Sequence, residues 1–467
     1  MATVLGANSV TGGYDVENSL RFNSGSSEYL LRTHGTNHTA VKFAISFWIK
    51  RSDVGNEQVA LTSYADGNNT GVIRFNANNT LEIFDYQSSY KLRKITNRVF
   101  RDISAWYHIV VSVDTAQGTA SNRFKLYVNG VQETSFSTDT NYSEDDANMF
   151  NKNVLNWIGA NPYNSGIGYT NGYMSEFVFI DGLQLAPTSF GEFDSDSGIW
   201  KPIKVSGLTF GDNGYYLEFK QAGTSQNASG MGADTSGNTD HWAVASLTAV
   251  DQSTDTCTNN FATMNSLDNF FSGSAFTEGN CKIVTTNGNI TYNTSTIGFS
   301  SGKWYMETKL AGSAGFTVGV VRGVATANDN DNKLGNRADG FSYDDGGAVE
   351  GNGGDLGGSF ATYEADDIIG VYADLDNNEL YFSKNGALQN SGTGLALTAG
   401  TYFFAVGDNN SSNSSTYEVN FGNPVSALSS AVSDGEYGAF EYSTTITGDS
   451  VSKTFKALNT KNLAEFG

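Results

Sequence analysis

The amino-acid sequence predicts an all-β protein with two antiparallel β-sandwich (jelly-roll) domains joined by a loop-rich region. Three observations lead to this fold class. Apolar and polar residues alternate in many short runs, as they do in half-buried strands, and no segment sustains the 3.6-residue period of a helix. Turn-forming residues separate the runs, with 53 glycines but only 4 prolines. A chain of 467 residues also exceeds what one hydrophobic core can hold.

Four strand-like segments define the first expected domain, residues 19–200. In the segment Phe43–Lys50 every odd-numbered residue is large and apolar, so one face of this strand should be buried. We expect Phe47, and Phe382 in the second domain, to lie on such buried faces. Asn129-Gly130 supplies the two positive φ angles of a type I′ hairpin turn. The four segments are 43–50, 105–114, 124–128 and 177–180.

The second expected domain, residues 285–425, repeats this pattern. One of its strands reaches another hairpin signal at Asn385-Gly386. Residues 201–284 are patchier, with a loop rich in Gly, Ser, Thr and Asn, and should form a connecting region that includes some strands. Residues 1–18 are expected to be an N-terminal arm without a core, and residues 426–467 a C-terminal extension. The strand segments of the second domain are 303–310, 368–372 and 379–383.

The charge of the chain excludes several partners. There are 27 Lys and Arg residues against 49 Asp and Glu residues, which gives a formal net charge of −22. Nucleic acid and anionic membrane surfaces require basic patches, so neither is an expected partner. No apolar run is long enough for membrane insertion, and the N-terminus lacks a signal-peptide pattern, so assembly in a cytoplasm is expected. The spacing of the two cysteines, Cys257 and Cys281, leaves open whether they pair.

Five local patterns in the first half together resemble the laminin-G-like, concanavalin A-like sandwiches. They cover about residues 19–190, and the resemblance implies a sandwich whose loops gather at its ends. The patterns are Leu20-Arg-Phe-Asn with Ser27-Glu-Tyr-Leu30, Phe43–Lys50, Trp106–Asp114 with Leu126–Gly130, Trp157-Ile-Gly159, and Met174–Phe177.

The second half resembles a SPRY domain along about 120 residues. The order and spacing of five motifs carry this resemblance, which implies a second β-sandwich. The motifs are Gly302-Lys-Trp-Tyr-Met-Glu307, Asp367–Val371, Asp374–Gly386, Tyr402–Val406 and Val419-Asn-Phe-Gly422.

The arrangement of the whole chain resembles virion structural proteins of marine bacteriophages, often called tail-fibre-like. That resemblance implies a virion surface protein assembled in the host cytoplasm. It also implies attachment to other virion proteins through the N-terminal arm and a homo-oligomer, with a trimer expected by analogy with tail fibres. The motifs that carry it are Leu5-Gly-Ala-Asn8, Gly13-Tyr-Asp15, Asn18–Asn23, Asp234–Asn238, Thr258–Thr263 and Ala457–Glu465.

We expect no enzymatic activity. Retaining glycosidases hold two carboxylates about 5 Å apart, and laminarinase-type relatives of the concanavalin A-like fold carry them on one strand as Glu-x-Asp-x-x-Glu. Here Glu82 and Asp85 are three residues apart, so on a strand they face opposite sides. His34 and His38 are four residues apart, but they lie in a stretch rich in Gly, Asn and Thr and not in the helix that a metal pair at this spacing needs. His108 and His241 have no Ser or Cys at a spacing typical of a catalytic triad. The four histidines are His34, His38, His108 and His241.

Calcium is the one cofactor for which the sequence offers candidate ligands. Laminin-G-like domains often bind Ca²⁺ through oxygen ligands in rim loops. Asp329 and Asp331 lie in the oxygen-rich loop Asn328–Asn332, and Asp344-Asp345 forms a second such loop. Neither matches the Asp-x-Asp-x-Asp-Gly…Glu calcium loop, which favours ordinary acidic loops.

Glycan binding would need exposed aromatic rings beside amides or carboxylates. Two pairs of tyrosines flank or lie in polar loops of the first domain. In the second domain, one tyrosine and the loop 408–413 are the candidates. The candidate ligand-binding residues are Tyr86, Tyr90, Tyr163, Tyr169, Tyr343 and Asn409.

These observations lead to a binding or structural function. The favoured function is a phage tail fibre or adhesin that binds a host surface glycan or receptor. The alternative is a capsid-decorating or head-fibre protein without a host ligand, and the sequence does not separate the two. A glycan hydrolase is disfavoured by the missing carboxylate pair, and a cellular SPRY adaptor by the missing RING and coiled-coil segments.

Overall fold

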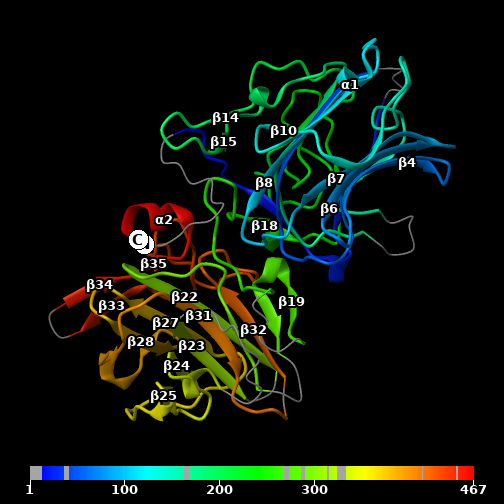
Figure 1. The fold of residues 1–467 in the computed structure, drawn as a ribbon. Helices are drawn as coiled ribbons and strands as arrows, with labels where there is room; N and C mark the ends of the chain where they lie inside the picture. Colours follow the sequence, from blue (N-terminus) through cyan, green and yellow to red (C-terminus); the bar gives the residue numbers. More distant parts are fainter. Residues whose placement is uncertain are drawn as a thin grey trace. The chain divides into compact units, whose positions relative to one another are not determined.

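The computed structural model of the chain divides after Thr258 into two compact units, called here the N-terminal and the C-terminal unit (Figure 1). Almost all regular structure in both is β-strand, which confirms the predicted fold class. The structure describes residues 13–35, 41–161, 168–267, 273–285, 290–312, 315–322, 333–412, 414–448 and 451–467.

Helices are few and short in these ranges. None of them has the length and hydropathy of a membrane span. The α-helices are α1 (Ala120–Arg123) and α2 (Thr460–Phe466), and the 3₁₀ turns are Ser24–Ser26, Pro187–Ser189, Ala249–Asp251, Glu278–Asn280, Leu334–Asn336 and Asn390–Gly392.

The N-terminal unit contains two eight-stranded antiparallel sheets, which we name after their central strands β3 and β6. The β3 sheet has the order β10-β9-β8-β3-β13-β1-β18, with β16 also pairing β13. Its strands are β1 (Ser19–Phe22), β3 (Lys42–Arg51), β8 (Trp106–Asp114), β9 (Phe124–Val128), β10 (Val131–Glu133), β13 (Gly172–Asp181), β16 (Tyr215–Leu217) and β18 (Gln252–Ser253).

The β6 sheet has the order β11-β7-β6-β5-β4-β12-β2-β17. A separate hairpin joins β14 (Gly191–Phe193) to β15 (Trp200–Pro202). The strands of the β6 sheet are β2 (Tyr29–Thr33), β4 (Gln58–Asp66), β5 (Asn69–Phe75), β6 (Thr80–Gln87), β7 (Tyr90–Val99), β11 (Phe136–Thr140), β12 (Leu155–Ile158) and β17 (Ala243–Ala245).

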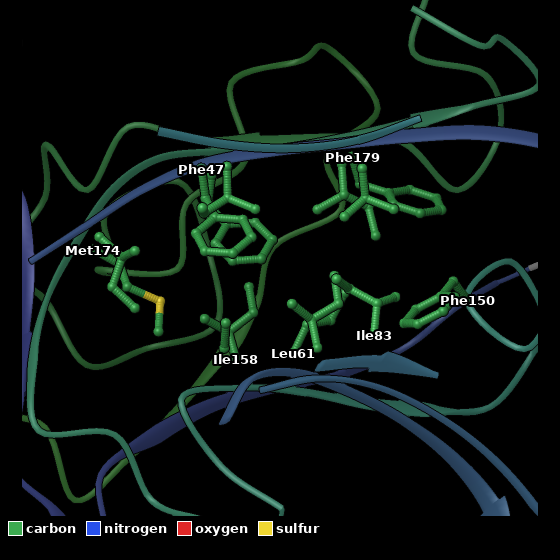
Figure 2. Packing of buried hydrophobic residues seen from close by; sticks show 14 of the residues in the cluster. Phe47, Leu61, Ile83, Phe150, Ile158, Met174 and Phe179 are labelled. Carbon is green, nitrogen blue, oxygen red and sulfur yellow. The ribbon is translucent and has the colours of Figure 1, made fainter. Parts of the chain in front are cut away.

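The core of the N-terminal unit lies between these two sheets (Figure 2). Phe47 is fully buried there, as predicted, and its ring stacks on Phe177 with centroids 5.0 Å apart. The other face of β3 was expected to be exposed, but Ala44 and Trp48 on that face are buried too. The reason is that residues from the start and the end of the unit, together with Phe190, Trp200 and Val205, cover the β3 sheet from outside. This second layer contains Val16, Trp48, Trp106, Tyr173, Trp200 and Cys257.

The expected connecting region is divided between the two units. Its first part, up to Thr258, adds β16, β17 and β18 to the sheets of the N-terminal unit. The remainder adds β19 and β20 to the C-terminal unit. From the expected N-terminal arm, Val16 is packed into the N-terminal unit, and residues 1–12 lie outside the described ranges.

The C-terminal unit has a nine-stranded sheet of order β19-β20-β32-β22-β27-β28-β29, with β30 pairing β28 and β35 running parallel to β22. Its strands are β19 (Ala275–Thr277), β20 (Lys282–Val284), β22 (Lys303–Gly312), β27 (Ile368–Asp374), β28 (Glu379–Lys384), β29 (Ala387–Leu388), β30 (Leu395–Ala396), β32 (Ser415–Asn420) and β35 (Lys456–Ala457).

A six-stranded sheet of order β21-β31-β23-β24-β25-β26 completes this sandwich. Phe382 is 1% exposed in the core, as predicted. The strands of this sheet are β21 (Tyr292–Thr294), β23 (Phe316–Arg322), β24 (Gly340–Asp344), β25 (Val349–Gly351), β26 (Gly354–Asp355) and β31 (Tyr402–Asp408), and a two-stranded hairpin joins β33 (Thr445–Gly448) to β34 (Val451–Thr454).

Two motifs that carry the phage resemblance fold together in the C-terminal unit. The Ala262 N–H donates to the Leu458 carbonyl (2.9 Å), and the Thr460 N–H donates to the Asn260 carbonyl (2.9 Å). The buried Asn462 side chain donates to the carbonyls of Gly435, Glu436 and Ala457. The segments 258–263 and 457–465 therefore close this unit by pairing its first residues with its last.

Both cysteines are buried as thiols, so the structure contains no Cys257–Cys281 disulfide. Burial raises the pKa of the Cys257 thiol well above its usual range, which makes that thiol a weak nucleophile.

Candidate ligand-binding face

The outer face of the β6 sheet carries a row of tyrosines. Strand alternation sends Leu81 and Ile83 of β6 into the core and turns Phe84 and Tyr86 to the outer face. Tyr86 lies opposite Tyr90 of β7 on one side and opposite Thr70 of β5 on the other. Thr70 lies opposite Tyr64 of β4. The row across β7, β6, β5 and β4 is Tyr90, Tyr86, Thr70 and Tyr64.

The spacing of this row suits an extended ligand. Tyr86 and Tyr64 are two strands apart, which corresponds to about 10 Å across the sheet. The rings of Tyr86 and Tyr90 meet edge to face with centroids 5.1 Å apart. Tyr90 is 42% exposed, and Tyr86 and Tyr64 are half-buried. The sequence-predicted pair Tyr86 and Tyr90 is therefore brought together, with Tyr64 as an addition that the sequence analysis missed.

Charged groups frame one end of the row. The Arg93 guanidinium lies over the Tyr90 ring, 4.7 Å from its centroid. Glu82 is almost completely buried and accepts from Arg74 (2.8 Å) and from Arg93 (2.8 Å). The hydrogen bond that Arg93 donates to Glu82 raises the pKa of Arg93. Two cations held by one carboxylate form a rigid polar edge beside the aromatic rings.

Asp85 points to the other side of the sheet from Glu82, as strand alternation predicts. It accepts from the Tyr142 hydroxyl (2.9 Å) and from the Met149 N–H (2.8 Å). Burial raises the pKa of Asp85 above its usual value. Glu82 and Asp85 therefore do not face a common substrate, and each carboxylate holds neighbouring protein groups.

A second pair of rings lies beside the start of β4, where Gly168 forms a bridge with Gln58. The Gly168 carbonyl accepts from the Val59 N–H (3.0 Å) and brings Tyr169 to the ring of Tyr29, with centroids 6.4 Å apart. Gly168 has a φ of +105°, and a side chain there would meet Val59 at 2.6 Å, so this position requires glycine. Tyr163 lies outside the described residues.

The tyrosine row continues into a shallow hollow of about 490 Å³ at the edge of the sheet. Tyr64 lies opposite Leu155 of β12, and Leu155 lies opposite Thr33 of β2. Leu155 and Thr33 both line the hollow. Arg32, another lining residue, forms an ion pair with Asp240, whose pKa is raised by burial. Sequence reasoning missed this hollow because its wall comes from three distant segments. The lining residues are Leu31, Arg32, Thr33, Leu155, Gln226, Thr239, His241 and Ala243.

The candidates in the C-terminal unit have structural roles. Tyr343 was expected in a loop, but it lies in β24 with its ring fully buried, and its hydroxyl donates to the Ala361 carbonyl. This corrects its assignment as a ligand-binding residue, because a core ring cannot reach a ligand. Asn409 is half-buried and donates from Nδ2 to Asp345 (2.8 Å), which ties two loops together.

A groove of about 250 Å³ lies between the nine-stranded sheet and the residues that follow β32. Glu307 in its wall accepts from the N–H groups of Glu441 (2.7 Å) and Tyr442 (3.3 Å). Burial raises the pKa of Glu307 to about 7. Because these hydrogen bonds go to the chain itself, we assign Glu307 to holding the C-terminal extension.

The metal candidates gain no support from the described residues. Asp329 and Asp331 lie outside the described ranges. Asp344 accepts from the Ala348 N–H (2.9 Å) within its own turn, and Asp345 accepts from the Gly315 N–H (2.6 Å) of another loop, so both carboxylates hold protein backbone. Within the described parts of the chain, no group of three His, Cys, Asp or Glu side chains is arranged to hold a metal ion.

Comparison with protein families gives two matches. Residues 23–183 match the laminin-G family described as the concanavalin A-like lectin/glucanases superfamily, and residues 303–423 match the SPRY domain family. The chain therefore contains a laminin-G-like domain and a SPRY domain, which are typically non-catalytic binding domains. A comparison with curated proteins gave no match.

Three solved structures are similar to part of the chain. The SPRY domain of human HERC1 has 19% identity and a TM-score of 0.26, covering 30% of this chain and 86% of that one. Stonustoxin has 19% identity and a TM-score of 0.26, covering 34% of this chain and 27% of that one. The PSpry domain of TRIM65 has 15% identity and a TM-score of 0.28, covering 34% of this chain and 91% of that one.

Proposed function

We propose that this chain is a phage virion surface protein that binds a host surface glycan through the outer face of its β6 sheet. The tyrosine row Tyr90–Tyr86–Tyr64 is the observation that carries the binding proposal. Aromatic rings stack on the apolar faces of sugars, and nearby charged groups accept or donate to sugar hydroxyls. The arginines on Glu82 and the adjoining hollow supply such groups on the same face.

The virion setting rests on the resemblance of the whole chain to tail-fibre-like phage proteins. The pairing of segments 258–263 and 457–465 supports it, because two of the motifs that define the resemblance form one structural joint. Several copies on one particle would multiply weak sugar contacts by avidity, so no single site need be strong. Attachment is assigned to the N-terminal arm, residues 1–18.

The binding test uses the full chain and a panel of host surface polysaccharides, with affinity measured by titration calorimetry. Replacing Tyr86 and Tyr90 with Ala should weaken binding about 10–100-fold, since stacked rings dominate such contacts. Tyr437→Ala, which removes a 52% exposed tyrosine from the C-terminal unit, is the matched control and should leave affinity unchanged. Equal affinity in all three proteins would remove the β6-sheet face from the proposal.

The location test distinguishes an adhesin from a decorating protein. Cryo-electron microscopy of the phage, with antibody against this chain, should place it on the tail, and purified protein should block adsorption to host cells. Density on the capsid together with unchanged adsorption would establish the decorating function instead.

A further inference from the structure

A buried lysine and a buried aspartate meet on the covered outer face of the β3 sheet. Lys50 Nζ lies 2.7 Å from Asp255 Oδ2, and neither side chain has any exposed surface. Lys50 belongs to β3, whereas Asp255 follows β18 near the end of the unit, 205 residues later in the chain. The contact therefore joins an early strand of the N-terminal unit to its last segment.

The surroundings of the pair are largely aromatic. In register across the sheet, Lys50 is flanked by Trp106 of β8 and Tyr173 of β13. Its Nζ lies 5.6 Å from the centroid of the Tyr173 ring. Trp106 Nε1 donates to the other carboxylate oxygen, Asp255 Oδ1, at 3.2 Å. The next charged pair on this face is Arg21 with Asp251, at 3.4 Å.

The position of Asp255 is held on its backbone side as well. The Ser19 hydroxyl donates to the Asp255 carbonyl (2.6 Å), and the Asp255 N–H donates to the Ser253 hydroxyl (3.0 Å). The carboxylate is therefore presented to Lys50 by a fixed backbone, which is the condition under which proximity accelerates a reaction most.

We propose that Lys50 and Asp255 form an intramolecular isopeptide bond. A proton passes from Nζ to Oδ2 along their hydrogen bond, which leaves a neutral amine and a neutral acid. This transfer removes two charges from a fully buried site, where charges are costly. The Nζ lone pair then attacks Cγ of Asp255, and the electron pair of the Cγ–Oδ1 double bond moves to Oδ1.

Trp106 Nε1–H stabilises the negative charge that develops on Oδ1, as the donor of an oxyanion hole does. When the double bond to Oδ1 re-forms, the bond from Cγ to Oδ2 breaks. The departing hydroxyl takes one proton from the attached nitrogen and leaves as water. The product is one amide bond between Nζ and Cγ, with the loss of one water molecule and no change in oxidation state.

Such a bond would stabilise the N-terminal unit mainly by restricting the unfolded chain. A covalent link between residues 205 apart closes a long loop, as a disulfide does, and the entropy lost on folding falls accordingly. Both cysteines are buried thiols, so the link would provide a covalent closure that is independent of redox conditions. This inference does not depend on the proposed glycan site.

The direct test is the intact mass of the denatured full-length protein. We expect a mass lower than the sequence mass by one water molecule, and fragmentation should find one peptide joining Lys50 to Asp255. Lys50→Arg and Asp255→Ala should both have their full sequence mass. If the wild-type protein has its full sequence mass and Lys50 is open to modification after denaturation, the contact is only an ion pair and the proposal is wrong.

Two further variants separate chemistry from folding. Lys42→Arg changes another lysine of β3, which pairs with Asp114 but is 43% exposed, and should keep the loss of one water. Trp106→Phe keeps an aromatic ring but removes the donor to Oδ1, so in a cell-free synthesis time course the bond should form about 100-fold more slowly. An unchanged rate in folded Trp106→Phe protein would overturn the role of Trp106.

Discussion

The two sheets of the N-terminal unit have similar inner faces but very different outer faces. Outside the β3 sheet, Trp48 and Trp106 are 1% exposed, beneath Trp200 and chain from both ends of the unit. Outside the β6 sheet, Tyr90 is 42% exposed and Tyr86 is half-buried. The outer face of the β3 sheet thus holds its polar groups buried, whereas the outer face of the β6 sheet keeps aromatic rings within reach of a ligand.

His108 shows how a polar side chain is accommodated on the covered face of the β3 sheet. His108 is fully buried between Trp48 and Trp200, with ring centroids 4.6 and 5.9 Å away. Trp200 Nε1 donates to His108 Nδ1 (2.9 Å), so Nδ1 accepts and Nε2 carries the proton toward the Ser46 hydroxyl (2.8 Å). This buried histidine is a structural element, because one ring nitrogen accepts from Trp200 and the other donates to Ser46.

The largest expected effect contrasts one ring from each outer face. Trp48→Ala should lower the free energy of unfolding by about 3–5 kcal/mol, because it leaves a cavity in a packed layer. Tyr90→Ala should change it by less than about 0.5 kcal/mol, since the ring is partly exposed. Urea unfolding of both variants measures the difference, and equal losses would show that the two faces are equally packed.

The next effect concerns the pH dependence of stability on the covered face. Glu176 lies at a bulge in β13 and accepts from the hydroxyls of Tyr216 and Tyr14. Burial raises the pKa of Glu176 to about 8 from 4.5. The folded protein therefore keeps a proton that the unfolded chain releases, so the stability from this group is complete below pH 4.5 and is lost as the pH rises toward 8.

Glu176→Gln keeps the hydrogen-bonding shape and cannot titrate. Relative to this variant, the wild-type protein should lose about 1.4 kcal/mol of unfolding free energy per pH unit between those two pKa values. Thermal unfolding of both proteins from pH 4 to pH 8 checks this. Parallel curves would mean that Glu176 is solvated and that water enters the covered face.

A smaller effect is expected for His108. Burial lowers the pKa of His108 to about 3, so its ring should remain neutral at pH 5. Nitrogen-15 NMR of the imidazole should show the Nε2–H form at that pH, whereas a free histidine would be mostly charged. A charged His108 at pH 5 would contradict both the assigned Nε2–H tautomer and the burial of this side chain.

The smallest effect is expected on the β6-sheet face. Arg93→Lys should leave stability within about 0.5 kcal/mol of the wild type, because surface ion pairs contribute little. The same variant should weaken glycan binding if the guanidinium acts beside Tyr90, since Lys does not reproduce its planar, multiple-donor geometry. Calorimetry separates these outcomes, and unchanged affinity would limit the site to the aromatic rings.

Sequence reasoning identified the elements but not always their surroundings. The burial of Phe47 and Phe382 followed from alternation alone, because the side of a strand is set by residue parity. Tyr343 was misplaced because acidic and glycine residues follow it, and its strand is defined by pairing with β25 across that turn and with the more distant β23. Tyr64 was missed because cross-strand neighbours depend on register, which composition does not reveal.

The sequence by itself determined the all-β class, the laminin-G-like and SPRY domains, and the inward side of the main strands, since local alternation and turn residues encode these properties. Only the tertiary structure decided which sheet face is covered, where the tyrosine row meets the hollow, and that Lys50 touches Asp255. These contacts join segments as far as 205 residues apart. Their formation depends on sheet register and on how the chain ends pack, which no local pattern specifies.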